Sequence, residues 1–520
     1  MSVTGWISRI ARRLRDGAER GFSTVIVMGA LLVGGLVVVA AFGATQPGIG
    51  LSGDDRDRKA AYAAAESGLA YYQFHLDQDV NYWADCKNVD PPSLTEPSPV
   101  NDRWVTGPDV RQWRSLPGAP GKYTIELLPA TGDPGVCSAT TMLDPATGTF
   151  RVRSTGVVGD EKRSIIATFR RRGFLDFIYF TEYETIPPLA YSTLALRESA
   201  LVECVKTARD GRPEDKNSYC LPLQFANGDK INGPFHTNDE ILVCNSPTFG
   251  RKAADRVEIS APLPRAFEAA QGCGATPNFL GTFVPSADPI ALPPDNKELE
   301  GYAAAAYTFT GKTTIVLDGN TMTVTNQGVK KTLPLPANGV VYVKSEGCSP
   351  TYEYRQVYNA PVGCGEAWVS GSYSKSLTIG TDNDVVIDGN LTKPAGSDAL
   401  LGLVATNFVR VYHPVMNPAG NCDMSTSSSL VNLTIHAAIL ALNQSFIVDN
   451  FYCGTHLEDL TIKGAVTQKF RGPVGLTTGQ GYIKKYDYDD QLRHREPPYF
   501  IDPVEAAWRI TRQNEQVPSR

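Results

Sequence analysis

The chain has 520 residues, of which 42% are hydrophobic and 20% are charged, and its formal net charge is −6 at pH 7. This length is enough for more than one domain with its own hydrophobic core. The acidic balance argues against a nucleic-acid-binding protein, because such a surface carries an excess of Lys and Arg.

An uncharged, apolar run covers residues 21–42, and the first charge after it is Asp54. A run of this length predicts one helix that spans a bilayer. Five Arg residues precede it, and positive flanks stay in the cytoplasm. We therefore expect a cytoplasmic leader over 1–21, a transmembrane helix over 22–53 and a large extracellular domain, in a single-pass membrane protein. Four helix-breaking residues are expected to end the helix: Gly43, Pro47, Gly48 and Gly50.

The ten cysteines are even in number, and no two are spaced as C-x-x-C. This pattern favours structural disulfides over zinc sites or redox motifs, and an oxidising compartment outside the cytoplasm. Connectivity does not follow from sequence alone, but short separations favour neighbouring pairs. The expected pairs are Cys86–Cys137, Cys204–Cys220, Cys244–Cys273, Cys348–Cys364 and Cys422–Cys453.

The junction Gly21-Phe22-Ser23, which opens the apolar run, resembles the processing site of type IV prepilins. The stretch 56–68, with its Ala-Ala-Ala-Glu core, is similar to the segment after the anchor in PilX-type minor pilins of high-GC Gram-positive bacteria. The resemblance implies cleavage after Gly21, with Phe22 as the new N-terminus. The partners that it implies are a prepilin peptidase, other pilins and pilus assembly proteins.

Ile26 departs from the pattern of major pilins. Those proteins carry Glu at the fifth mature position, where it neutralises the N-terminal amine of a neighbouring subunit, since an unpaired charge in an apolar bundle is costly. Ile26 cannot do this, so the resemblance implies a minor, priming or tip position.

Residues 54–178 are expected to form a helix, from about 54 to 77, followed by a small pilin-like β-head. Ser52 is a suitable N-cap for that helix. Strand-like runs follow at 122–128, 149–154 and 163–169, and the last two read as a hairpin that turns at Gly159-Asp160. The run Arg170-Arg171-Arg172 is expected on a solvated surface or against acidic lipid headgroups.

Residues 179–510 have short β-branched runs separated by Gly, Asn and Asp turns, and an opening Leu-Thr-Ile recurs at 377, 433 and 460. This sequence pattern predicts the rungs of a right-handed parallel β-solenoid, with an open β-sandwich as the alternative. A flexible tail is expected over 511–520. The predicted fold class is therefore α+β, mainly β: a transmembrane helix, a small head and a large β-rich ectodomain.

Catalytic signals are weak. The six histidines show no metal-binding spacing, and no nucleophile or phosphate-binding motif is present. The segment 236–239 (His-Thr-Asn-Asp) reads as a turn with local hydrogen bonds rather than a polar site. Asp382, Asp384 and Asp388 could form a carboxylate line, as in β-helical glycan-cleaving enzymes, or hold calcium, but they also read as turn residues.

The sequence therefore predicts a structural, non-enzymatic minor pilin that acts in pilus assembly, priming or surface adhesion and needs no cofactor. The alternatives are a membrane-anchored β-helical lyase or glycosidase, and a glycan-binding surface protein. A surface glycan or a protein is the expected ligand in the case of adhesion, and no nucleic-acid partner is expected.

Overall fold

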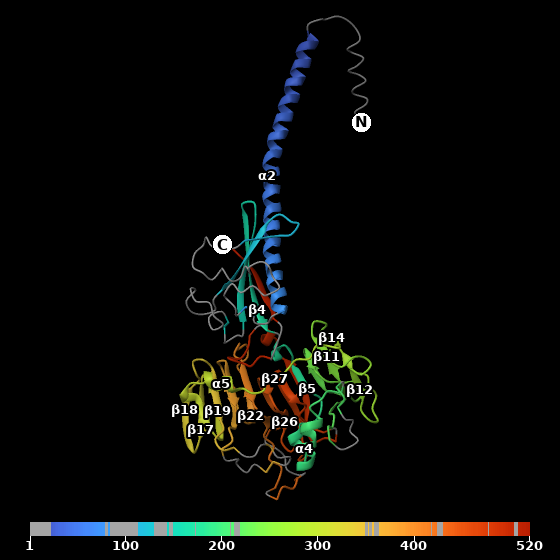
Figure 1. The fold of residues 1–520 in the computed structure, drawn as a ribbon, viewed down its shortest axis with the longest axis vertical. Coiled ribbons are helices and arrows are strands. Elements are labelled where there is room, and N and C mark those ends of the chain that lie inside the picture. The colour runs from blue at the N-terminus through green and yellow to red at the C-terminus, as the bar shows by residue number, and fades with distance from the viewer. Residues whose placement is uncertain are drawn as a thin grey trace.

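The computed structural model describes residues 22–78, 82–83, 113–128, 143–144, 149–171, 173–208, 210–212, 219–348, 352, 356–357, 363–417, 419–423, 430–476, 478–493, 495–503 and 508–519. Figure 1 shows three parts stacked along one long axis: a projecting helix, a small sheet against its lower half, and a broad β-rich domain below. We call the sheet with the helix segment packed on it the head, and residues 173–503 the large domain.

The head combines one long helix with an antiparallel sheet. Helix α2 (Phe22–Gln78) has 57 residues, which corresponds to about 85 Å at the usual rise per residue. The sheet has the strand order β1-β2-β3-β4-β29. Its strands are β1 (Arg114–Ser115), β2 (Lys122–Leu128), β3 (Thr149–Val158), β4 (Glu161–Arg171) and β29 (Trp508–Gln516).

Helix α2 packs on this sheet through a stripe of buried residues at helical spacing: Ala61, Ala64, Ala65, Leu69, Tyr72 and Leu76. The sheet contributes aromatic side chains to the same core, and the rings of Phe150 and Phe169 stack with centroids 5.1 Å apart. The ring of Trp508 meets Phe150 edge-on at 4.6 Å. The C-terminal strand β29 therefore completes the core of the head, and residues 511–516 belong to the sheet rather than to the predicted flexible tail.

The helix lies so close to the sheet that Gly156 in β3 has no room for a side chain. A Cβ atom there would lie 2.0 Å from the carbonyl oxygen of Ala61 and 2.6 Å from the amide nitrogen of Ala65. Both clashing atoms belong to the helix backbone, which cannot rotate away. Close backbone approach is a recognised role of glycine within a strand.

The substitution Gly156→Ala is therefore expected to destabilise the head by about 1–3 kcal/mol, as overpacking of a filled core does. Thermal unfolding followed by near-UV circular dichroism measures the effect. The matched control is Gly53→Ala on α2, where nothing lies within 4 Å of the new Cβ. That change should be neutral or slightly stabilising, because Ala favours a helix over Gly. Equal unfolding temperatures for the two variants would contradict the close approach.

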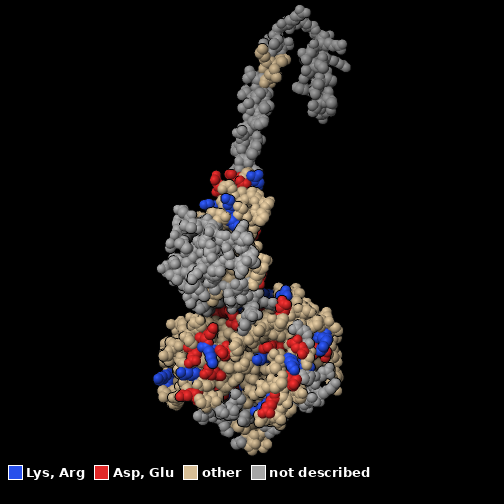
Figure 2. Space-filling view, in the orientation of Figure 1, with Lys and Arg blue, Asp and Glu red and all other residues tan. Residues whose placement is uncertain are grey.

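The predicted transmembrane helix over 22–53 and the single-pass membrane location are wrong. Among the residues that the structure describes, no helix is both long and apolar enough to cross a membrane. The helix over these residues also does not end at the predicted break: α2 continues through Pro47 and the charged stretch 54–59 to Gln78. A proline inside a helix removes one hydrogen bond and can kink the helix without ending it. Figure 2 shows the charged stretch on α2 just above the head, where Lys59 pairs with Asp55 at 2.7 Å.

The large domain consists of short strands with a few short helices. Its strands are β5 (Tyr179–Tyr183), β6 (Gln224–Phe225), β7 (Lys230–Asn232), β8 (Phe235–Thr237), β9 (Ile241–Val243), β10 (Thr248–Phe249), β11 (Arg256–Ile259), β12 (Phe267–Ala269), β13 (Asn278–Phe279), β14 (Thr282–Pro285), β15 (Thr308–Thr310), β16 (Thr313–Gly319), β17 (Thr321–Asn326), β18 (Val329–Pro334), β19 (Val340–Lys344), β20 (Ala367–Tyr373), β21 (Leu377–Thr381), β22 (Val385–Thr392), β23 (Leu401–Ala405), β24 (Val409–Val411), β25 (Thr434–Ala441), β26 (Phe446–Val448), β27 (His456–Phe470) and β28 (Gly481–Tyr488). Its helices are η2 (Phe174–Asp176), η3 (Pro188–Ala190), α4 (Leu194–Glu203), α5 (Lys297–Tyr302), η4 (Ala305–Tyr307) and η5 (Asp490–Arg493).

Most of these strands pair in parallel, but their order in space is not their order in the chain. One ladder runs β15-β19-β21-β23-β25-β27-β5-β8-β11-β14. The chain enters this ladder in the middle at β5, builds outward to β14, crosses to β15 and returns inward to β27. The first and last strands of this ladder along the chain therefore meet: Val466 in β27 pairs with Tyr179 in β5.

The predicted fold class is wrong in two respects: no described helix can span a membrane, and no β-solenoid is shown. Successive rungs of a solenoid stack in chain order, whereas β5 lies between β27 and β8. Strands β17 and β18 pair antiparallel, and β6, β9 and β12 form a separate three-stranded sheet. The strands of the alternative, an open β-sandwich, are usually antiparallel, whereas most strands here pair in parallel. The chain is a mainly β protein with few helices.

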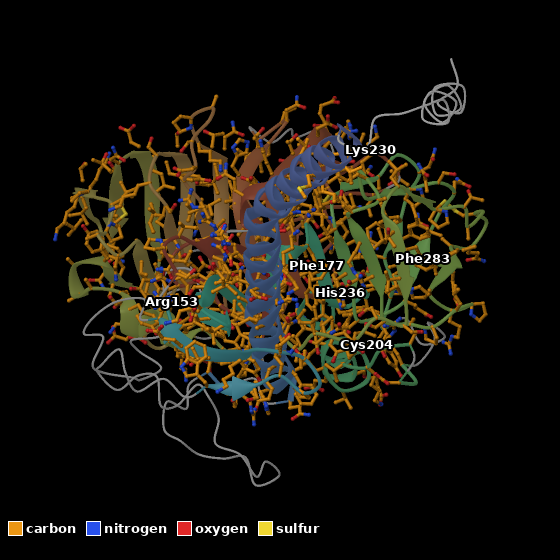
Figure 3. All side chains as sticks on the ribbon, turned by 90° about the horizontal axis from the view of Figure 1, so that it is seen from above. Arg153, Phe177, Cys204, Lys230, His236 and Phe283 are labelled. Carbon is orange, nitrogen blue, oxygen red and sulfur yellow. A yellow bond between two sulfur atoms is a disulfide. The ribbon has the colours of Figure 1, made fainter. Side chains whose placement is uncertain are left out.

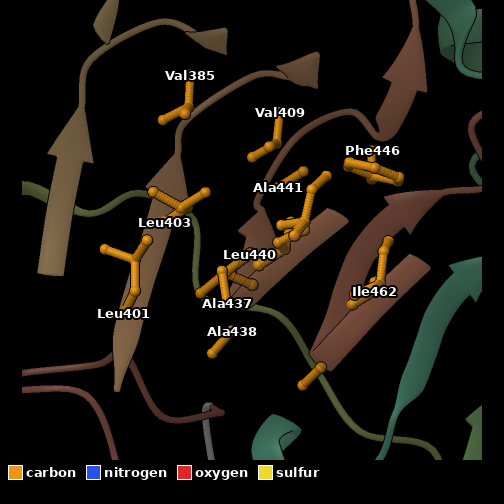
Figure 4. Close-up of a cluster of buried hydrophobic side chains, with 14 of the residues drawn as sticks. Val385, Leu401, Leu403, Val409, Ala437, Ala438, Leu440, Ala441, Phe446 and Ile462 are labelled. Atoms are coloured by element: carbon orange, nitrogen blue, oxygen red, sulfur yellow. The ribbon is translucent and has the colours of Figure 1, made fainter. Parts of the chain in front are cut away.

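Aliphatic side chains from neighbouring strands fill the interior of the large domain. Figure 4 shows Leu403 of β23, Leu440 of β25 and Ile462 of β27 in one cluster, and all three are fully buried. Burial of each such side chain contributes roughly 1.5–3 kcal/mol. The Val/Ile/Leu-rich runs of the sequence are therefore strands buried inside the domain, as is usual for parallel ladders.

Candidate functional site

The predicted disulfide positions fall into two groups. The structure joins Cys204–Cys220, Cys244–Cys273, Cys348–Cys364 and Cys422–Cys453, which are the neighbouring pairs expected from the sequence. Cys86 and Cys137 lie outside the described residues, and so does Gly21 of the predicted processing site. Phe22 is the first residue of α2.

His236 lies in β8, completely buried between aromatic rings. Its ring stacks on Phe180 with centroids 5.5 Å apart and meets Phe177 at 5.1 Å, and Figure 3 labels Phe177 and His236 close together, beside α2 in that view. The ring nitrogens Nδ1 and Nε2 lie 2.8 Å from Glu258 Oε2 and 3.0 Å from Asn238 Oδ1. His236 is therefore part of a buried polar network.

Asp239, the last residue of the segment 236–239, holds the chain between β5 and β6 in place. Its carboxylate accepts hydrogen bonds from the backbone amides of Glu184 and Ala208, and it pairs with Arg212. The predicted turn role of this segment is thus extended: its side chains fasten segments that are distant in the sequence.

The other histidines do not gather. His75, His413 and His436 have a pKa lowered mainly by burial, and the Nδ1 of His413 bonds to the carbonyl oxygen of Asp449. His456 is partly exposed and lies 3.1 Å from the carbonyl oxygen of Gly479. His494 lies outside the described residues.

The carboxylates of Asp382, Asp384 and Asp388 are not a shared site. Asp382 accepts hydrogen bonds from the hydroxyl of Tyr342 at 2.6 Å and the amide of Ser345 at 2.7 Å. Asp384 points to Arg410, and burial raises the pKa of Asp388. In the part of the chain that the structure describes, no three His, Cys, Asp or Glu side chains are placed to hold a metal ion.

Arg410 is the centre of a buried charge cluster that the sequence did not reveal. Its guanidinium donates to Glu366 at 2.9 Å, Asp384 at 2.8 Å and Asp449 at 2.9 Å, and none of the four side chains is more than 4% exposed. Burial raises the pKa of Asp384 to about 7, against the opposing effect of Arg410. In the sequence, the one signal for this cluster was the cation Arg410 between two valines in a very short strand (409–411).

Arg170 joins the head to the large domain. It is 1% exposed, and it donates to Glu496 from Nε at 2.6 Å and to the carbonyl oxygen of Leu492 at 2.8 Å. Asp176 lies 3.9 Å away. The predicted solvated position of this residue is therefore wrong: Arg170 is buried because Glu496, 326 residues further along the chain, meets it at the junction.

Two cavities flank the head. A groove of about 990 Å³ runs beside α2, where Ala60, Ala63 and Ser67 face Trp113 and Leu116. A second cavity of about 420 Å³ lies between β29 of the head and β11 of the large domain, and we call it the junction pocket. Three Arg residues (Arg256, Arg493 and Arg509) and two carboxylates (Asp176 and Glu258) line it, together with apolar residues.

No protein family and no curated protein matches the chain. Among solved structures, the competence-associated pilin ComZ from Thermus thermophilus is similar. The sequence identity is 13%, the match covers 89% of this chain and 98% of that chain, and the TM-score is 0.28. No comparison supports the narrower PilX-type resemblance.

Proposed function

We propose that the chain is a structural, non-catalytic subunit of a pilus-like filament, in which α2 assembles with helices of other pilin-like subunits and the large domain is displayed at a filament end. The observation that carries the proposal is the shape of the molecule. The lower half of α2 is packed on the head sheet, and the upper half projects beyond it (Figure 1).

The projecting part of α2 supports helix-to-helix assembly. Val27, Met28, Leu31 and Val33 are between 56% and 70% exposed. A run of exposed aliphatic side chains on a helix is unfavourable in water and is covered when helices pack together. Partner helices with apolar faces are therefore the occupants that this part of α2 suits.

The large domain supports a terminal position. A domain of more than 300 residues below the head would collide with copies stacked tightly along a shaft, whereas a single copy at an end meets no such neighbour. The large domain also supports a structural role, because the buried carboxylates of Glu366, Asp384 and Asp449 are all paired with Arg410.

The test replaces Met28 and Leu31 together by lysine and measures, by quantitative mass spectrometry, how much of the protein remains in filaments sheared from the producing cells. We expect incorporation to fall at least tenfold, because two desolvated charges are costly in an apolar helix bundle. The matched control is Leu194→Lys on α4, which is 70% exposed like Leu31 but lies at the opposite end of the molecule. Unchanged incorporation of the double variant, or a copy number similar to that of the main subunit, would overturn the proposal.

A further inference from the structure

The junction pocket is locally positive in an acidic protein. Its lining contains three guanidinium groups and two carboxylates, whereas the whole chain carries a net charge of −6. Figure 2 shows acidic and basic side chains interspersed on the visible face of the large domain. The pocket therefore concentrates Arg where the surface in view mixes both signs.

Each of the three Arg residues is oriented by one or two carboxylates, and the Nε of Arg493 lies 3.2 Å from Oδ1 of Asp490. Arg256 donates from Nε to Glu258 at 2.6 Å, and Arg493 donates from Nη2 to Asp255 at 2.8 Å. Arg509 donates from Nη2 to Asp176. Among the described residues, none accepts a hydrogen bond from either terminal nitrogen of Arg256, and its side chain is 60% exposed. The guanidinium groups are thus oriented, and they retain N–H groups that can donate hydrogen bonds to a ligand.

Each of the two lining carboxylates also contacts a second basic side chain on the side away from the pocket. Asp176 lies near Arg170 as well as Arg509. Glu258 lies between Arg256 and the Nδ1 of His236.

The amide of Asn238 fixes the position of His236. Its nitrogen donates to the carbonyl oxygen of Ile290 at 2.7 Å, and its oxygen accepts from the amide of Ile290 at 2.9 Å. The oxygen of Asn238 therefore faces His236 Nε2, which donates to it. Because Nδ1 lies 2.8 Å from Glu258 Oε2, the carboxylate of Glu258 is contacted by Arg256 on one side and by His236 on the other.

We propose that the junction pocket binds an oxyanion group, a carboxylate or a phosphate, of a small ligand, which the free N–H groups of Arg256, Arg493 and Arg509 hold. The planar guanidinium fork matches such groups with two parallel hydrogen bonds. The volume of about 420 Å³ is in the range of small-molecule sites. A bound anion would bridge β29 of the head and β11 of the large domain, and the proposal does not depend on the filament function.

Isothermal titration calorimetry on the whole chain tests this, with inorganic phosphate and malonate as probes and sodium chloride at equal ionic strength as the blank. We expect saturable binding of at least one probe, and the arm that binds identifies the oxyanion. The substitution Arg256→Gln should weaken it about tenfold or more, since a charge-assisted bidentate contact is lost. Arg256→Lys, which retains the charge but not the fork, should weaken it less.

The matched control is Arg265→Gln. Arg265 belongs to the same domain, is 56% exposed and lies 3.8 Å from Glu240, but it is outside the pocket. It should bind both probes as the unchanged protein does. The proposal fails if neither probe binds saturably, if Arg256→Gln binds equally well with an unchanged unfolding temperature, or if Arg265→Gln loses as much affinity.

Discussion

Replacing Arg410 by methionine is expected to destabilise the large domain by about 3–5 kcal/mol, the usual cost of removing one partner from a buried ion pair. Glu366, Asp384 and Asp449 would remain buried with no cation between them. Urea unfolding followed by tryptophan fluorescence measures the shift in midpoint. The control Arg265→Met removes an exposed Arg with one carboxylate at 3.8 Å and should change the stability by less than about 0.5 kcal/mol. Equal midpoints for the two variants would show that the cluster does not stabilise the domain.

The pH dependence of the same cluster gives a second readout. Burial raises the pKa of Asp384 to about 7 in the folded protein, whereas the unfolded chain has an ordinary value near 4. A carboxyl group with a raised pKa favours the folded state when it is protonated. Its stabilising contribution is therefore complete below about pH 4 and is lost as the pH rises through 7.

The variant Asp384→Asn removes this titration while preserving an acceptor for the amide of Phe408, which bonds to Asp384 at 3.0 Å. The stability of the original chain relative to this variant should rise as the pH falls from 8 to 4.5. Unfolding midpoints at pH 8, 6 and 4.5 measure the difference. A difference that stays constant over this range would contradict the raised pKa.

The second large effect is expected at the junction of the head and the large domain. The substitution Arg170→Met leaves Glu496 buried with no partner, and burial already raises the pKa of that carboxyl group. We expect a loss of about 3–5 kcal/mol. Much of it should appear as opening of the junction, because Arg170 links β4 to Leu492 and Glu496. Limited proteolysis should then cut near residues 171–178 in the variant before it cuts the unchanged chain.

A double variant separates the charge from the packing. Arg170→Met combined with Glu496→Gln leaves no lone charge at the junction, so a large part of the lost stability should return. If the double variant is cut as fast as the single variant, the ion pair is not what holds the two parts together.

Local features of the sequence predicted several elements correctly because the information lies in neighbouring residues. The hairpin expected around Gly159-Asp160 is observed as β3 and β4, and Gly159 has the positive φ of 56° that such a turn favours. The helix expected from about 54 to 77 is observed as the lower part of α2, whose buried stripe repeats with the helical period. The four described disulfides join cysteines that are 16 to 31 residues apart.

The order of the strands in space could not be predicted, because the backbone hydrogen bonds between strands do not depend on which strand is the partner. Residues 179–183 and 466–470 are far apart in the sequence, and only the folded chain places Tyr179 beside Val466. Residues 511–516 were expected in a flexible tail, and they are part of β29 because β4 supplies the edge with which they pair.

By itself, the sequence determined the lower part of α2, the hairpin of β3 and β4, and the four cysteine pairs that the structure describes, since these follow from periodicity and chain separation. Only the tertiary structure determined which charged side chains are buried. Arg170 was expected at the surface, and both Arg170 and Arg410 are buried because carboxylates 26 to 326 residues away along the chain converge on them. Burial of a charge is tolerated only where such partners meet, and that meeting is a property of the fold.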